Sequence, residues 1–118
     1  MNVKLPQEVE IWYLIPAIRR EFARGLLKKG LRQREIARKL GITDAAISQY
    51  FSSKRGNEVD FSESIRKEIS QSVDKIHEGA NAMSELQRIC RLCKQDRVCC
   101  FIHKHHGAPQ DCKVCFPE

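Results

Sequence analysis

The sequence predicts an all-α fold in which a basic helical domain is followed by a connecting helix and a small cysteine-rich tail. Apolar residues recur at steps of three and four along most of the chain up to Cys90, which is the period of an amphipathic helix. No segment has a pattern that predicts a strand of more than a few residues. All six cysteines and all four histidines follow residue 58, so the two halves of the chain differ in composition.

Length and composition favour one ordered unit with an appendage. The chain has 118 residues, of which 42% are hydrophobic and 31% charged, which excludes a disordered chain. Its longest apolar runs, residues 11–15 and 98–102, are far shorter than the ~20 residues of a membrane span. Residues 1–10 lack the apolar stretch of a secretory signal. We therefore expect a cytoplasmic protein whose cysteines ligate a metal or undergo redox chemistry rather than form permanent disulfides.

The positive charge is concentrated in the first half of the chain. Residues 1–58 hold 12 basic and 6 acidic side chains, whereas residues 59–118 hold 9 of each, so the whole net charge of +6 lies before residue 59. Such a concentration is typical of a surface that binds a polyanion. Charge and cysteine distribution together predict three parts: a basic domain at 1–58, a connecting helix at 59–82 that could also dimerise, and a cysteine-rich region at 83–118.

A short leading helix and three longer helices are predicted in the basic domain. The stretch from Gln7 to Lys29 has helical periodicity, but Pro16 lacks an N–H, so we expect a short leading helix, a break or kink, and a main helix from about Pro16 to Lys29. A second helix fits residues 33–40, with Gly41 as its left-handed C-terminal residue. The third starts at Thr43, whose hydroxyl can cap it, and ends over residues 52–56.

Two further helices are predicted after residue 58. Asp60 and Glu63 have capping-box spacing before an apolar stripe, which consists of Ile65, Ile69, Val73 and Ile76. A stripe of this width is equally consistent with a dimer seam and with a helix that covers the core of the same chain. A last helical segment, with Met83, Leu86, Ile89 and Cys90 on its apolar face, leads into the tail.

Residues 33–52 meet the requirements of a helix-turn-helix together. Ala37 is small where the helices would cross, Gly41 allows the turn, and Ile36, Leu40, Ile47 and Tyr50 can form a common core. On the second helix of the motif, Gln49 could form two hydrogen bonds with adenine, Ala45 could pack on a thymine methyl, and Ser48 could contact a base or a phosphate. Gln33, Lys54 and Arg55 are better placed for backbone phosphates, and Asp44 is as consistent with a helix-start residue as with cytosine recognition. The candidate residues for contacts with double-stranded DNA are Gln33, Thr43, Asp44, Ala45, Ser48, Gln49, Ser52, Lys54 and Arg55.

The segment LIPAIRREFARGLLKKGLRQREIARKLGITDAAISQYFSSKRG resembles the helix-turn-helix of archaeal transcriptional regulators related to the phage-repressor and xenobiotic-response-element group. In that archaeal set a similar domain is followed by a cysteine-rich tail, so the resemblance implies a regulator along nearly the whole chain. It also implies that Cys100 and His103 are a recurrent feature. Asp44 departs from the uncharged polar residue that the pattern has at this position.

The tail contains two Cys-x-x-Cys pairs, at Cys90 and Cys93 and at Cys112 and Cys115. Four thiolates at this spacing can converge on one centre. Neither pair contains the glycine or proline often found in zinc knuckles, which favours an iron-sulfur cluster over structural zinc and over a metal-free thiol switch. The candidate metal ligands are Cys90, Cys93, Cys100, Cys112 and Cys115, while Cys99 is interpreted as a small apolar residue.

These features predict a dimeric, sequence-specific transcriptional regulator whose DNA binding is controlled by an iron-sulfur cluster. One alternative is a DNA- or RNA-binding protein with a purely structural zinc site. Another, from a different class, is a small thiol oxidoreductase that uses Cys90 and Cys93, although the βαβ context it needs is missing from the sequence. No phosphate-binding glycine loop or catalytic residue set is evident, so we do not expect an enzyme.

Overall fold

A computed structural model describes residues 5–52 and 59–96, and all regular structure in these two ranges is helical. The elements in chain order are α1 (Pro6–Val9), the π-helical segment η1 (Glu10–Leu14), α2 (Ile15–Lys28), α3 (Gln33–Leu40), α4 (Asp44–Phe51), α5 (Glu63–His77) and α6 (Ala82–Gln95). The predicted helix at 33–40 is confirmed at both ends, and the last predicted segment extends to Gln95.

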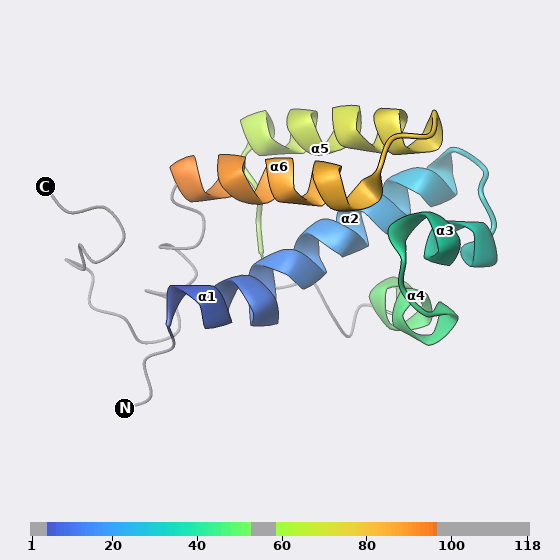
Figure 1. Cartoon of the computed structure of the whole chain (residues 1–118), viewed down its shortest axis with the longest axis horizontal. Helices are drawn as coiled ribbons and strands as arrows, with labels where there is room; N and C mark the ends of the chain where they lie inside the picture. The colour runs from blue at the N-terminus through green and yellow to red at the C-terminus, as the bar shows by residue number, and fades with distance from the viewer. Residues whose placement is uncertain (1–4, 53–58, 97–118) are drawn as a thin grey trace, which may run out of the picture.

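The break predicted near Pro16 is a π-helical segment rather than a loop. In η1 the N–H of Ile15 donates to the carbonyl of Glu10, one residue further back than in an α-helix. Pro16 then lies in the first turn of α2, where its missing N–H costs little. Helices α1 and α2 are therefore joined through η1 (Figure 1), and α2 ends before Gly30, whose φ is +95°.

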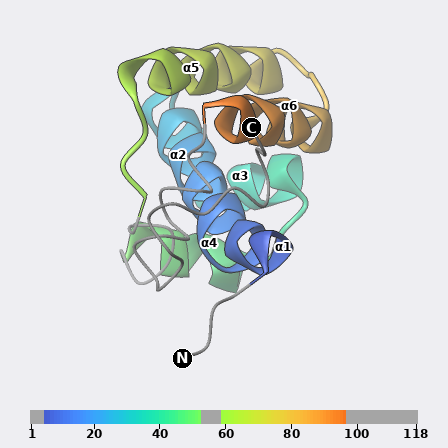
Figure 2. The same cartoon turned by 90° about the vertical axis from the view of Figure 1, so that its left-hand side faces the viewer.

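Helix α2 is the centre of the molecule. The α5–α6 hairpin lies on one side of it, and α4 lies on the other (Figure 2). Side chains from all these helices form one hydrophobic core. The core residues that are fully shielded from solvent include Leu14, Ile18, Leu26, Ile36, Ile47 and Ile89.

The apolar stripe of α5 belongs to this core. Ile65, Ile69, Val73 and Ile76 are each at most 5% exposed, and α5 contacts α2 and α6. Of the two interpretations of the stripe, the structure shows the second: it covers the core of its own chain. A seam between two copies cannot use side chains that are already buried within one copy.

The capping box predicted for α5 is wrong by two residues. The helix is capped by Ser62, whose Oγ accepts a hydrogen bond from the N–H of Ile65 at 3.3 Å and donates one to Asp96 Oδ2 at 3.1 Å. Asp60 precedes the cap and instead forms an ion pair with Arg66 at 3.0 Å. The sequence offers two capping residues here, and only the packing of the stripe decides where the first turn begins.

A polar network fastens α5 to α6. Ser72 has no exposed surface; its Oγ donates to Glu85 Oε1 and accepts from Arg88 Nη2, both at 2.7 Å. Arg88 also binds Glu68 Oε1 at 2.6 Å. Burial raises the pKa of Glu85, but the hydrogen bonds from Ser72 and Arg88 and the positive charge of Arg88 outweigh it, so the pKa lies below its ordinary value.

Candidate nucleic-acid interface

Helices α3 and α4 form the predicted helix-turn-helix. Gly41 has a φ of +69°, a left-handed conformation that favours glycine. Its turn brings the chain to Thr43, whose Oγ1 accepts the N–H of Ala46 at 3.1 Å and so caps α4. Ala37 is 5% exposed, and its small side chain lets the two helices approach closely. The cap, the turn and the small residue were each predicted and are each confirmed.

Helix α4 has one buried face and one open face. Ile47 and Tyr50 are buried against the core, and the Nε of Arg20 donates to the carbonyl of Tyr50 at 3.2 Å, which ties the end of α4 to α2. The open face consists of Thr43, Asp44, Ala45, Ser48, Gln49 and Ser52, all exposed. Every outward position predicted for this helix is therefore accessible. Lys54 and Arg55 lie outside the described residues.

Gln33 joins the start of α3 to the open face of α4. Its Nε2 donates to Ser48 Oγ at 2.7 Å and to the carbonyl of Asp44 at 3.2 Å. The carbonyl accepts only, so this contact identifies the nitrogen of the amide. Both hydrogens of the amide are then directed at α4. The remaining Oε1 can only accept, and so can a phosphate oxygen, so the two cannot form a hydrogen bond with each other. In this conformation Gln33 positions α4 instead of offering a donor to a phosphate.

The same bond fixes what Ser48 can offer. Because Ser48 Oγ already accepts from Gln33, its own hydrogen remains available for an acceptor on a ligand. Ser52 differs, since its Oγ donates to the carbonyl of Gln49 at 3.0 Å and keeps only acceptor capacity. Gln49, by contrast, has an exposed side chain, and within residues 5–52 and 59–96 no hydrogen bond occupies the oxygen or nitrogen of its side-chain amide, the two atoms that a bidentate contact needs.

Arg20 holds the end of α4 but is not among the residues predicted from the sequence. A signal was present: Arg20, Arg24 and Lys28 are spaced four residues apart, which places them on one face of α2. Other cations that flank the motif turn toward α5. Lys29 forms an ion pair with Asp74, and Lys39 Nζ donates to the carbonyl of Ile76 at 3.3 Å, so both join the motif to the hairpin.

Two of the five candidate metal ligands lie in the described part of the chain. Cys90 and Cys93 are three residues apart on the last turns of α6, so both project toward the same side of the helix. Cys93 is fully buried in the core, and Cys90 is half-buried. Burial, with a contribution from the carboxylate of Glu10, raises the pKa of the Cys90 thiol from 9.0 to about 11. Such a thiol is protonated at neutral pH and is a weak nucleophile.

The other three candidate ligands, Cys100, Cys112 and Cys115, lie outside the described residues, as do Cys99 and His103. Among residues 5–52 and 59–96, no group of three or more histidine, cysteine, aspartate or glutamate side chains could hold a metal ion. The described chain therefore supplies two thiols of the predicted centre, and the centre itself stays a prediction. In the same two ranges no helix is long and apolar enough to cross a bilayer.

Residues 23–56 match a family model described as Helix-turn-helix, of the Xre and phage-repressor type. The matched range contains the end of α2, all of α3 and α4 and the residues that follow. No curated protein and no solved structure matches the chain. The fold and this match define a helix-turn-helix domain, which supports a DNA-binding transcription regulator.

Proposed function

We propose that this protein is a sequence-specific transcriptional regulator that inserts α4 into the major groove of DNA and responds to a cysteine-ligated iron-sulfur cluster. The observation that carries the DNA-binding half is the open face of α4. Six polar or small side chains are exposed on a helix that is capped, anchored at both ends and short enough for the groove.

Each residue of that face has a distinct task in the proposal. Gln49 forms the bidentate contact to adenine, and Ala45 packs on a thymine methyl. Ser48 donates its free hydroxyl hydrogen to a purine N7 or to thymine O4, while its oxygen accepts from Gln33.

The reading of bases is tested by selection from a random duplex library at fixed salt. Wild-type protein is expected to enrich one sequence, and Gln49→Ala to lose preference at one position by about 1–3 kcal/mol. Gln71→Ala, an exposed glutamine on α5, is the matched control. Enrichment of the same sequence to the same degree by Gln49→Ala would remove Gln49 from base reading.

The residues of α6 suit a thiolate-ligated centre in type and spacing, with one consequence for the core. An iron-sulfur cluster would supply a redox-sensitive group held by thiolates. Cys93 packs in the same core as Ile89, so ligation at this position would change the surroundings of a buried side chain. In the proposal, the cluster-loaded and cluster-free proteins differ at this end of α6, and that difference supplies the two states of a switch.

The contacts that connect α6 to the DNA-binding helices lie at the other end of α6 from Cys90 and Cys93 (Figure 1). Helix α6 contacts α2 and α3, and the network around Ser72 fastens α6 to α5. Lys39 then joins α3 to the end of α5 through the Ile76 carbonyl. In the proposal, a cluster therefore acts by displacing α6 as a whole against α3, and Gln33 passes this displacement to α4.

The cluster half of the proposal is tested by purification under strict exclusion of oxygen. We expect visible absorbance, iron and acid-labile sulfide, and a Cys93→Ser variant that lacks them, while Cys99→Ser keeps them. A colourless protein with about one zinc per chain would instead support the structural zinc site. Equal affinity of cluster-loaded and cluster-free protein for the selected duplex would reject control by the cluster.

The proposal also includes a homodimer, because helix-turn-helix proteins of this type read two half-sites. A twofold dimer would place its α4 helices roughly 34 Å apart. The α5 stripe is excluded as the seam by its burial. Footprinting on the selected duplex should show two protected half-sites about one helical turn apart, and a single half-site would contradict the dimer.

A further inference from the structure

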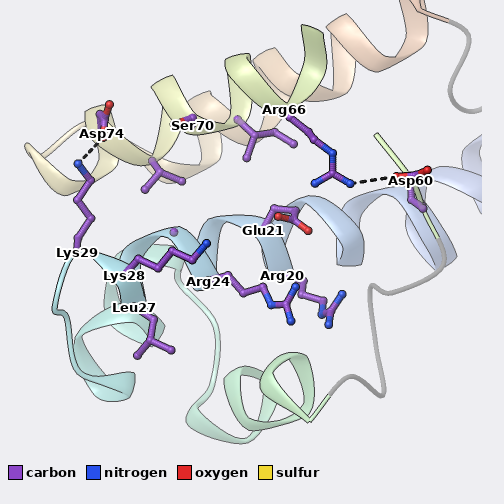
Figure 3. A pocket seen from close by; sticks show the side chains of 14 residues that line it. Arg20, Glu21, Arg24, Leu27, Lys28, Lys29, Asp60, Arg66, Ser70 and Asp74 are labelled. Atoms are coloured by element: carbon purple, nitrogen blue, oxygen red, sulfur yellow. Dashed lines mark hydrogen bonds and ion pairs between the residues drawn. The ribbon is translucent and has the colours of Figure 1, made fainter. Parts of the chain in front are cut away.

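An open groove runs between α2 and α5, outside the α3–α4 motif. Cationic side chains from α2 line one wall, and charged residues of α5 line the other (Figure 3). Arg20, Arg24 and Lys28 lie on one stripe of α2. Arg20 and Arg24 extend toward the side on which α4 lies (Figure 3).

The cations that line the groove differ in whether an acidic side chain pairs with them. Two of the lining cations are neutralised, since Lys29, at the C-terminal end of α2, pairs with Asp74 of α5, and Arg66 of α5 pairs with Asp60. On the α2 side, Arg24 and Lys28 are exposed and neither has an ion-pair partner among residues 5–52 and 59–96. Glu21 lines the same wall and is the one carboxylate there that neither ion pair uses. Cations therefore outnumber unpaired anions on this wall.

The groove adjoins the end of α4. Arg20 lines it and at the same time donates to the carbonyl of Tyr50, in the last turn of α4. When a recognition helix lies in the major groove, about 8.5 Å deep, the sugar-phosphate backbones rise on both sides of that helix. The α2 wall therefore lies beside the C-terminal end of α4, where a sugar-phosphate backbone of bound DNA would run.

We infer that the α2 wall of this groove, through Arg24 and Lys28, binds backbone phosphates of the DNA that flanks the bases read by α4. This inference rests on the proposed function and adds a phosphate-binding surface on α2, outside the α3–α4 motif. Contacts of this kind neutralise phosphates and release counterions, so they strengthen binding to every sequence alike.

The test compares two double variants that lose the same charge. Arg24→Gln with Lys28→Gln removes the two exposed cations of the α2 wall. Lys67→Gln with Lys75→Gln removes two exposed cations of α5 that do not line the groove. Glutamine is a good helix former and all four positions are exposed, so both proteins should fold, which circular dichroism checks.

Binding is measured by fluorescence anisotropy with the selected duplex and with an unrelated duplex, over salt from about 0.05 to 0.2 M. The groove variant should bind both duplexes roughly tenfold more weakly, and its salt slope should fall by about 2. The control should keep the wild-type slope. A groove variant that matches the control would overturn the inference while wild-type binding stands, whereas wild-type protein that binds no duplex would reject the proposed function itself.

Discussion

Gln33 Nε2 lies 2.7 Å from Ser48 Oγ, so the first residue of α3 holds the middle of the open face of α4. The two residues are 15 positions apart in the chain, and both are exposed. The bond orients an exposed hydroxyl and couples α3 to α4. The two helices are therefore held together by a polar contact at the open face of α4 as well as by apolar contacts inside.

The first prediction is that Gln33 and Ser48 act together on DNA affinity. Gln33→Ala should lower the free energy of unfolding by no more than about 1 kcal/mol, since its bonds are exposed. In binding to the selected duplex, the Gln33→Ala and Ser48→Ala changes should show a coupling energy of about 0.5–1.5 kcal/mol in a double-mutant cycle. Additive losses across the cycle would mean that the bond does not shape the reading face.

The second prediction concerns Gly25, at the crossing of α2 and α5. A Cβ at this position would lie 2.7 Å from Val73 Cγ2, too close for a real contact. Gly25→Ala should therefore destabilise the fold by about 1–3 kcal/mol, despite the better helix propensity of alanine. Denaturant unfolding measures this change. Adding Val73→Ala makes room for the Cβ, so the double variant should lose less than the sum of the single losses.

The third prediction is a dependence of stability on pH through Glu85. Its pKa is lowered in the folded protein, so the stabilisation from its ionised form is present above the ordinary value of 4.5 and is lost as the pH falls through the lower folded value. Denaturant unfolding of wild type and Glu85→Gln from about pH 6 to about pH 3 should show their difference shrinking across this window. A difference that is constant over that range would contradict the ionic role of Glu85.

Much of the motif could be predicted from the sequence because its determinants are local. Periodicity and Gly41 predicted the bounds of α3, and the Thr43 hydroxyl predicted the start of α4. The cap of α5 was misassigned, since Asp60 and Ser62 are both capping residues and burial chooses between them. An apolar stripe has the same pattern whether it is buried within one chain or between two, so only the structure could settle that question.

The polar contacts between helices could not be predicted from the sequence, for a different reason. The bonds of Gln33 to Ser48, of Arg20 to Tyr50 and of Lys39 to Ile76 join residues on different helices, and no pattern along the chain marks them. The π-helical segment was predicted only as a break, because Pro16 indicates where a hydrogen bond is missing and not how the backbone adjusts. All five candidate metal ligands stay predictions, and Cys100, Cys112 and Cys115 lie outside the described residues.

The fourth prediction tests the central claim most directly: the ratio of affinities for the selected duplex and for a scrambled duplex of equal length. At fixed salt near physiological strength, wild-type protein should bind the selected duplex at least ~10³-fold more tightly. Gln49→Ala should reduce that ratio by about tenfold or more, and the α5 control Gln71→Ala should leave it unchanged. A ratio near one for wild-type protein would show that α4 does not read sequence and would contradict the account.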